Sequence, residues 1–419
     1  MKKYDVAVIG GGFSGVAAAL AAARESARVI IIEKANCLGG AATNCLVNPF
    51  MLYYTKINGK KTALSQGLFK KIHQALKARG GMLMQSFAES FSEEELKLLL
   101  LDMIEEAKID VLFHATIFKS NVENHQIKSV EVATKGGVLA IDADYFVDAS
   151  GDAELAYLSG CPTTLGREED HLCQPMTLCF RVGNVNVKKF FAGKKDLDAA
   201  YAAARANGEV TNPRENILVF KTPIENVLHF NTTRVIKKNP TNPFDVTEAE
   251  IIARKQVREV FDFMKKHARG FENAFLMMTA SQIGVRESRM IRGEHILTEA
   301  ECKACTKFPD AIAACNYDID IHNPEGSGTS HYYFAPGEYY TIPYRSLIPL
   351  GVTNMLVAGR CISSDHGAQA SYRIMPTVTA IGEAAGTAIG LAVKKGVSVR
   401  DVDVKKLQNT LLANNAFIS

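Results

Sequence analysis

Three glycines near the start of the chain have the spacing of a dinucleotide-binding turn. Gly10, Gly12 and Gly15 follow an apolar run that begins at Tyr4. A tight turn out of a strand, a pyrophosphate on bare backbone and a helix packed close to the sheet each need a residue without a Cβ. The helix start would face the phosphates, and Glu33, after the next apolar run, could hydrogen-bond a ribose hydroxyl. The pattern predicts a nucleotide-binding βαβ unit.

Three later segments also carry residue types suited to a bound cofactor. Residues 145–152 are a buried strand that ends in small residues, a glycine and an acid, and residues 357–361 are another strand running into glycine. Residues 371–376 lead through a proline into a long helix of small residues. Proline is favourable in a first helical turn, and the free N–H groups there bind negative charge. In a flavoprotein, such groups can stabilise the reduced ring at its N1/C2=O edge.

Hydrophobic periodicity predicts the elements that position these segments. Residues 17–25 are Ala-rich and helical, and residues 28–32 are typical of a buried parallel strand. Helical spacing at 62–79 and a capping-box start at Ser92 predict two more helices, the second ending near Lys108. Four alternating runs then predict a β-meander that returns to the main sheet, at 111–118, 127–133, 138–141 and 145–147.

The character of the sequence changes after Leu165. Loops containing Asn and Pro, Phe-rich strands and a long amphipathic helix at 247–268 occupy the middle of the chain. A buried strand at 354–359 follows, and then the long helix from Pro376. We therefore expect an α/β fold with a discontinuous nucleotide-binding domain (1–165 and 341–419) and an inserted α+β substrate domain (166–340).

Taken together, the motifs resemble the FAD-dependent oxidoreductase family of bacterial flavoproteins. They are the opening glycines and residues 148–152, 284–289, 342–349, 354–360 and 373–376. That group is similar to a branch of the glutathione-reductase-type FAD fold and is related to the flavin subunit of heterodisulfide reductase. The resemblance covers nearly the whole chain. It implies FAD, bound non-covalently by a Rossmann-like domain with a β-meander, and it implies no particular substrate.

The resemblance carries residues over by motif to each part of FAD. The glycine turn would hold the pyrophosphate and Glu33 the adenosine ribose, while Gly151 and Asp152 would approach the adenine half. Segment 39–43 would line the ribityl side, and the segments at 359–360 and 375–377 would contact the flavin. The implied cofactor-binding residues are Gly10, Gly12, Phe13, Ser14, Gly15, Glu33, Lys34, Gly39, Gly40, Ala41, Thr43, Ser150, Gly151, Asp152, Gly359, Arg360, Met375 and Thr377.

Cysteine spacing limits the redox chemistry expected. Disulfide reductases of this fold place C-x-x-x-x-C just after the paired glycines, whereas this chain has Cys45 alone after Gly39 and Gly40. One thiol cannot run a dithiol cycle by itself. Cys302 and Cys305 form a C-x-x-C that could be a redox pair, but no strand precedes them, so we favour two cysteines near a helix end. A second G-x-G-x-x-G is absent, so we expect no built-in nicotinamide domain.

Arginines in the middle of the chain are candidates for substrate binding. Arg286, Arg289 and Arg292 recur every three residues, so on a helix they would lie along one broad face. Their guanidinium forks bind carboxylates or polyols through paired hydrogen bonds. A solvated or domain-bridging face explains any one of them at least as well.

Histidines supply the candidate proton acceptors. His322 alternates with Asp318 and Asp320 as on one side of a strand. His366 lies between Arg360 and Arg373, where it could take a hydroxyl proton while hydride leaves for the flavin, although a lone histidine is more often structural. The predicted catalytic residues are His366, Arg360, Arg373, His322 and Arg286. Zinc and iron–sulfur spacings are absent, so no metal site is expected.

Composition favours a globular enzyme over a nucleic-acid or membrane protein. The chain has 419 residues, 47% hydrophobic and 22% charged, with a formal net charge of +3 and no basic stripe. We expect no signal peptide ahead of the first strand and no apolar run near the ~20 residues of a membrane span. Nine cysteines without a framework spacing favour a reduced, cytoplasmic setting.

The function predicted is hydride exchange between FAD and a small organic substrate, either a sugar-like alcohol or a carboxylate. A separate electron donor or acceptor would close the cycle, and the sequence also allows a homo-oligomer. Two alternatives stay open: the flavin subunit of a larger electron-transfer complex, and a tRNA-modifying flavoprotein. The near-neutral charge argues against an RNA partner.

Overall fold

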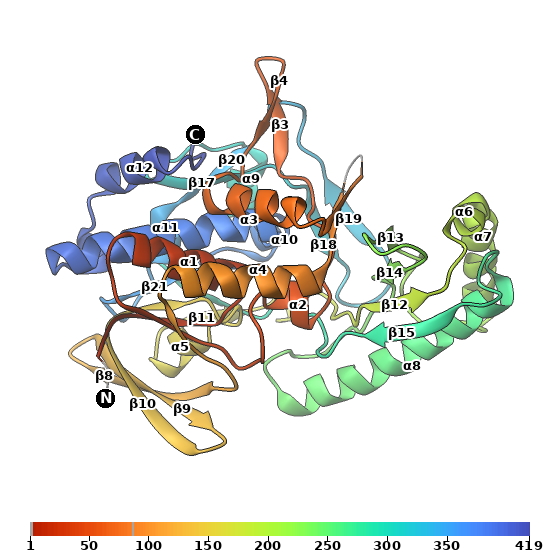
Figure 1. Cartoon of the computed structure of the whole chain (residues 1–419), viewed down its shortest axis with the longest axis horizontal. Coiled ribbons are helices and arrows are strands. Elements are labelled where there is room, and N and C mark those ends of the chain that lie inside the picture. The colour runs from red at the N-terminus through yellow and green to blue at the C-terminus, as the bar shows by residue number, and fades with distance from the viewer. Residues whose placement is uncertain (1–2, 86–87) are drawn as a thin grey trace.

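The computed structural model describes residues 3–85 and 88–419, which form a larger and a smaller body (Figure 1). The larger body carries both chain ends, and the smaller body projects to one side around α8. The fold is α/β, and the first three elements are the predicted βαβ unit.

The larger body is built around a seven-stranded sheet with strand order β7-β2-β1-β10-β9-β8 and β21 paired to β10. The strands of its parallel part are β7 (Asp110–Leu112), β2 (Val29–Ile32), β1 (Tyr4–Ile9), β10 (Gly137–Asp148) and β21 (Met355–Val357). The β2 sequence is apolar throughout and fully buried, as expected for a parallel strand covered on both faces. The carboxyl ends of these strands therefore meet at one edge, which is where ligands bind in such sheets.

Strand β10 joins the main sheet to the predicted meander. Its first half pairs antiparallel with β9 (Gln126–Thr134), which pairs with β8 (Thr116–Glu123), and its second half pairs parallel with β1. The runs at 138–141 and 145–147 are thus one strand and not two. The run at 111–118 is instead divided between β7 and β8. The meander is present, but its strands differ from the predicted ones.

Two helices pack closely on this sheet because one of them presents glycines to the other. In α11 (Met375–Lys395), a Cβ on Gly382 would overlap the Ser14 carbonyl of α1 (Phe13–Arg24), and a Cβ on Gly386 would overlap the Ala18 carbonyl. Among the described residues, α11 is the one helix long and apolar enough to cross a membrane, contrary to the expectation that no run has this length. However, 94% of that window is buried inside the protein, so core packing accounts for its apolar character.

Shorter elements complete the larger body. The predicted helix at 62–79 begins only at Gly67, because residues 62–63 belong to a hairpin strand. The predicted helix start at Ser92 is present, with Ser92 Oγ accepting from Glu95 N at 3.4 Å. These elements are α2 (Ala41–Asn44), β3 (Tyr54–Ile57), β4 (Lys60–Ala63), α3 (Gly67–Ala78), β5 (Met82–Met84), β6 (Glu89–Phe91), α4 (Glu93–Glu106), α5 (Glu154–Leu158), β11 (Thr163–Leu165), β16 (Arg289–Ile291), α9 (Glu299–Lys303), β17 (Ala311–Cys315), β18 (Ile319–His322), β19 (Thr329–Tyr332), β20 (Tyr340–Pro343), α10 (His366–Tyr372) and α12 (Val404–Ala413).

The smaller body has its own sheet and core. Its elements are β12 (Phe180–Gly183), α6 (Val187–Ala192), α7 (Lys194–Ala206), β13 (Val219–Lys221), β14 (Leu228–Phe230), α8 (Pro243–His267) and β15 (Phe275–Thr279). Helix α8 begins at Pro243, earlier than predicted, because the Asn242 side chain caps it by accepting from Phe244 N and Asp245 N. Phe180 and Phe230 stack at 5.0 Å in its core, which extends through Ile283.

The packing after Ile283 differs from the predicted domain boundary at 340. Leu297, Ile312, Tyr317 and Tyr340 belong to the core of the larger body. The segment that follows Ile283 in sequence therefore returns to the larger body well before residue 341. The buried core of the smaller body thus ends near Ile283.

A buried ion pair connects the two bodies. Arg181 of β12 donates to Glu93 of α4 at 2.5 Å, and their side chains are 1% and 5% exposed. His229 of β14 is also buried, and within the described chain neither ring nitrogen makes a well-formed hydrogen bond. Burial and the positive charge of Arg181 lower the pKa of His229 to about 3.

His229 should make the protein sensitive to acid. The unfolded chain gains a proton on this residue below its ordinary pKa of 6.5, whereas the folded protein does not until about 3. Stability should therefore fall as pH drops through this window, by up to about 1.4 kcal/mol per pH unit. In urea unfolding, His229→Gln should flatten this slope, and His125→Gln, at an exposed site, should not. Equal slopes for wild type and His229→Gln would contradict this.

Candidate active site

A cavity of about 460 Å³ lies at the carboxyl ends of β1, β2 and β10, a volume typical of small-molecule sites. Its lining includes Ile9, the glycine turn, Glu33, Lys34 and the loop before α2. The wall is completed by residues of the smaller body and the segment after it: Pro240, Val246, Glu250, Gln282, Ile283 and Val285. The cavity is thus formed between the two bodies.

The glycine turn has the backbone that a pyrophosphate site requires. Gly10 has φ +99°, a left-handed conformation that favours glycine, and a Cβ on Gly15 would overlap the Gly10 carbonyl. A Cβ on Gly12 would have open space, with Gly40 Cα nearest at 3.8 Å. Gly12 is also the N-cap of α1 and supplies no side-chain cap, so the first N–H groups of α1 are available to an anion.

The adenosine end is set by Glu33, the acid that follows β2. Glu33 is buried and accepts from Gly11 N at 2.5 Å and Ala35 N at 2.7 Å. These bonds fix the carboxylate, and its remaining lone pairs can accept from a ribose hydroxyl. Lys34 lines the cavity and pairs with Glu154 at 3.2 Å.

A fixed guanidinium lies beside Gly151 and Asp152, after the end of β10. Arg360 NH2 lies 2.7 Å from Asp152 Oδ1, while its Nε is buried without a partner among the described residues. Although burial opposes ionisation, the charges of Arg360 and Lys34 hold the pKa of Asp152 below its usual value. Gly359, with φ +97°, lets the chain pass Ser14 closely.

Helix α11 brings a second free helix start to the cavity. Met375 and Val378 line it, the N-cap Ile374 has no capping side chain, and Pro376 lies in the first turn. Two uncapped helix N-termini therefore face one cavity, one suited to a pyrophosphate and one to a negatively charged ring edge. This donor set, with the bare backbone at Gly12, fits FAD.

Some predicted cofactor residues do not line the cavity. Thr43 Oγ1 donates to Leu38 O at 2.8 Å within its own loop, Thr377 is buried in α11, and Gly15 serves helix packing. Wall residues that the motifs did not indicate include Ala42, Asn44, Cys45, Glu154, Glu250, Gln282 and Ile283. Of these, Cys45 could have been identified from its position just after the glycine pair. Burial raises the pKa of its thiol to about 12, which disfavours a reactive thiolate.

Only two of the five predicted catalytic residues line the cavity. Arg360 and Arg373 line the cavity, whereas Arg286, His322 and His366 do not. Arg286 lies in a loop before β16 and not on a helix, so the predicted helical face of arginines is wrong. His366 begins α10, and its Nδ1 lies 2.7 Å from Glu287 Oε1.

Both ring nitrogens of His322 are engaged. Nδ1 lies 3.2 Å from Arg234 NH2 and Nε2 lies 3.4 Å from Asp320 Oδ2. Burial and the charge of Arg286 lower the pKa of His322 well below its usual value. Asp318, Asp320 and His322 do meet on one side of the β18–β19 hairpin, where His331 bonds Asp318 at 2.6 Å. His322 is thus placed to position neighbours, with neither nitrogen free to accept a proton from a substrate.

Cys302 and Cys305 are free thiols beside the end of α9. Burial raises the pKa of both, which disfavours the reactive thiolate. Within the described chain, no three His, Cys, Asp or Glu side chains are grouped to hold a metal ion.

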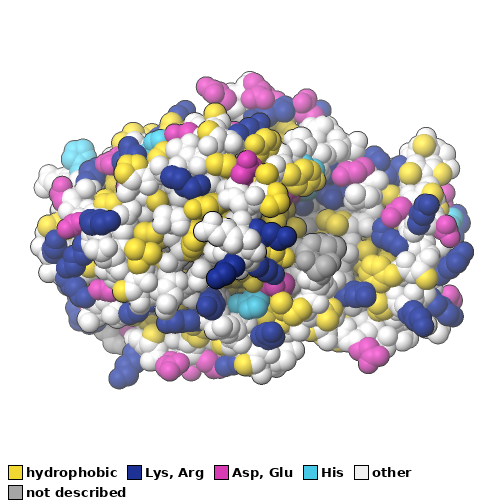
Figure 2. All heavy atoms as spheres, turned by 90° about the horizontal axis from the view of Figure 1, so that it is seen from above, with side chains coloured by type: hydrophobic (Ala, Val, Ile, Leu, Met, Phe, Trp, Pro, Cys, Tyr) yellow, Lys and Arg dark blue, Asp and Glu magenta, His cyan; other side chains and the backbone are white. Residues whose placement is uncertain are grey.

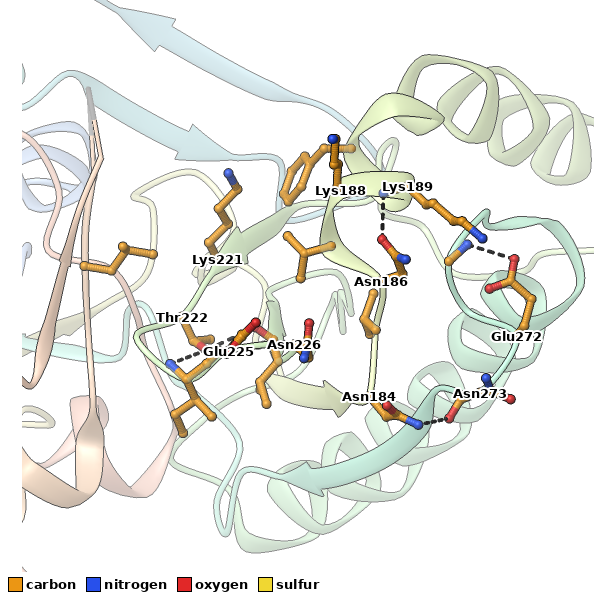
Figure 3. A pocket seen from close by; sticks show the side chains of 17 residues that line it. Asn184, Asn186, Lys188, Lys189, Lys221, Thr222, Glu225, Asn226, Glu272 and Asn273 are labelled. Carbon is orange, nitrogen blue, oxygen red and sulfur yellow. Dashed lines mark hydrogen bonds between the residues drawn. The ribbon is translucent and has the colours of Figure 1, made fainter.

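A larger hollow of about 840 Å³ lies on the smaller body and shares no lining residue with the first (Figure 3). Lys188, Lys189 and Lys221 surround it, together with asparagines already bonded to backbone, such as Asn184 to Asn273 O at 3.1 Å. Among the described residues it contains no buried polar side-chain atom without a partner. It offers nothing comparable to the two free helix starts of the first cavity.

A family model described as FAD dependent oxidoreductase matches residues 5–411. The chain therefore belongs to this family: it is an FAD-dependent oxidoreductase, and FAD is its cofactor. No curated protein shows significant sequence similarity to it.

Solved structures resemble it only distantly. A geranylgeranyl bacteriochlorophyll reductase-like protein from Thermoplasma acidophilum has 13% identity and a TM-score of 0.48, over 98% of this chain and 83% of that one. The p-nitrophenol 4-monooxygenase of Pseudomonas putida has 11% identity and a TM-score of 0.49, over 100% and 91%. A flavoprotein/dehydrogenase from Cytophaga hutchinsonii has 13% and 0.45, over 99% and 86%. These scores favour no particular reaction.

Proposed function

We propose that this oxidoreductase exchanges hydride between FAD and a small organic substrate that enters between the two bodies. The observation that carries the proposal is the position of Arg373. This residue lines the cavity beside the start of α11 and also contacts polar residues behind the wall. Its NH2 donates to Gln174 Oε1 at 3.3 Å and to the Asp320 carbonyl at 3.4 Å. A substrate held there would lie at the flavin end of the cavity.

The protein's own groups have separate tasks in this proposal. Bound FAD supplies the hydride acceptor or donor. The N–H groups at the start of α11 would hold negative charge on the bound ring, and Arg373 would orient the substrate. Ile283 of the smaller body and Val285 just after it cover the site from water.

We also propose that the domain is of the glutathione-reductase type, an inference supported by the meander of β8, β9 and β10. A separate electron donor or acceptor would close the cycle, since the sequence has one dinucleotide turn only. Nine free cysteines support a reduced, cytoplasmic setting. Lysines and arginines are scattered over the face in Figure 2, which offers no basic stripe for nucleic acid.

His366 is the proposed proton acceptor. Glu287 Oε1 faces its Nδ1 and, by accepting a hydrogen bond from Nδ1–H, would leave the Nε2 lone pair able to take a substrate hydroxyl proton. Because His366 lies behind the cavity wall, the proposal requires a substrate that extends towards α10.

In anaerobic stopped-flow measurements, His366→Ala should slow flavin reduction by about 10²-fold with FAD content retained. His295→Ala, which removes a histidine paired with Glu301 outside the cavity wall, is the control. An unchanged rate of reduction in His366→Ala would end this assignment.

A further inference from the structure

Arg373 in the cavity wall is close to three arginines behind it, Arg214, Arg234 and Arg286, and the nearby carboxylates do not balance their charge. Glu215 forms ion pairs with two of them, at 3.8 Å from Arg214 and 3.4 Å from Arg234. Asp320 approaches Arg373 no closer than 4.0 Å and is shared with His322. The four arginines thus have two carboxylates near them, which leaves an excess of positive charge in a largely buried region.

Arg286 is the clearest case of a cation without an anion. It donates to neutral oxygens only: Pro175 O at 2.6 Å, Thr177 Oγ1 at 2.5 Å and Asn231 Oδ1 at 3.4 Å. Within the described part of the chain, no carboxylate lies within ion-pair distance of it. Burial and the charges of Arg373, Arg214 and Arg234 lower the pKa of Arg286 to about 9.

Arg373 connects this excess charge to the cavity. It lines the cavity, and its Nε is buried without a hydrogen-bond partner among the described residues. Val285, the residue before Arg286, lines the same wall. Uncompensated buried charge is costly, and a bound anion would relieve it while satisfying the free donors.

We propose that the substrate is a carboxylate, held by Arg373 in the cavity wall and attracted by the unpaired charge of Arg286 behind it. The proposal rests on the proposed function and selects the carboxylate over the sugar-like alcohol. Guanidinium forks match the two oxygens of a carboxylate, whereas a neutral polyol would leave the excess charge in place. Bound in this way, the carboxylate would fix the orientation of the reacting carbon towards the ring.

Calorimetric titration of malonate into the FAD-loaded protein tests the proposal. We expect malonate to bind and its neutral diamide, malonamide, not to bind. Arg286→Met should weaken malonate binding about tenfold or more, and Arg286→Lys, which keeps the charge but not the fork, should weaken it less. The control is Arg292→Met, at an exposed arginine of the same segment, with affinity unchanged.

FAD content and circular dichroism of each variant show whether it folds. If Arg286→Met does not fold, the malonate affinity of Arg286→Lys is the test. Equal binding of malonate and malonamide, no malonate binding, or full affinity in both Arg286 variants would overturn the carboxylate proposal. If one of these results is found but a neutral substrate still reduces the flavin of the yellow protein, only the carboxylate proposal fails and the proposed function stands. A holoprotein that no organic substrate reduces contradicts the proposed function instead.

Discussion

Replacement of Gly12 by alanine should give a folded protein that no longer retains FAD. The backbone there is extended, with φ −70° and ψ −177°, and an added methyl would meet only Gly40 Cα at 3.8 Å. The fold without cofactor therefore tolerates alanine, but the methyl would occupy the space where a pyrophosphate must approach the backbone. Keeping the pyrophosphate away from the N–H groups at the start of α1 would weaken FAD binding by about 100-fold or more.

Gly136→Ala is the matched control, because that glycine lies in a surface turn with space for a methyl. FAD titration of apoprotein, followed by flavin fluorescence, compares the two variants at equal circular dichroism. Gly15→Ala should behave differently from both, since its methyl overlaps the Gly10 carbonyl and should destabilise the fold itself. Full FAD affinity in Gly12→Ala would mean that the pyrophosphate does not lie on this turn.

The ion pair between the bodies should produce the largest change in stability. Arg181→Met leaves the Glu93 carboxylate buried without its partner, and breaking such a pair costs about 3–5 kcal/mol. Urea unfolding should be measured above pH 7, so that His229 is neutral in both the folded and unfolded states. The double variant Arg181→Met/Glu93→Leu should recover most of the loss, because it removes both charges.

Lys119→Met, which breaks an exposed pair with Glu131, should change stability far less than Arg181→Met, because solvent screens such a pair. A similarly small loss in Arg181→Met would show that the buried pair is solvated and does not hold the two bodies together. Failure of the double variant to recover stability would point instead to lost packing of the arginine stem.

The features that could be predicted from the sequence are those set by residues close together in the chain. A residue without a Cβ is needed at Gly10 and Gly15 whatever the rest of the chain does, and Glu33 follows from the length of one βαβ unit. The cofactor could therefore be predicted from a few motifs. Similarly, the Ser92 cap is a local hydrogen bond that its own segment specifies.

Reasoning from spacing failed where tertiary packing decides. A repeat of three at Arg286 does not specify a helix, and the segment is instead a loop and a short strand. Glu250 and Gln282 reach the cavity only because the smaller body docks there, which their neighbours in sequence do not encode. The polar cluster joining Arg286, His322 and Arg373 likewise depends on elements far apart in the chain.

The central claim is that the cavity between the two bodies holds FAD and that a small organic molecule exchanges hydride with it there. The most direct measurement is the visible absorption spectrum of the purified protein under anaerobic conditions during titration with carboxylates, polyols and sugars. We predict a yellow protein with one FAD per chain, whose flavin absorbance is bleached by a member of the carboxylate set. A colourless protein that does not take up FAD, or bound FAD that no small organic molecule reduces, would contradict the account.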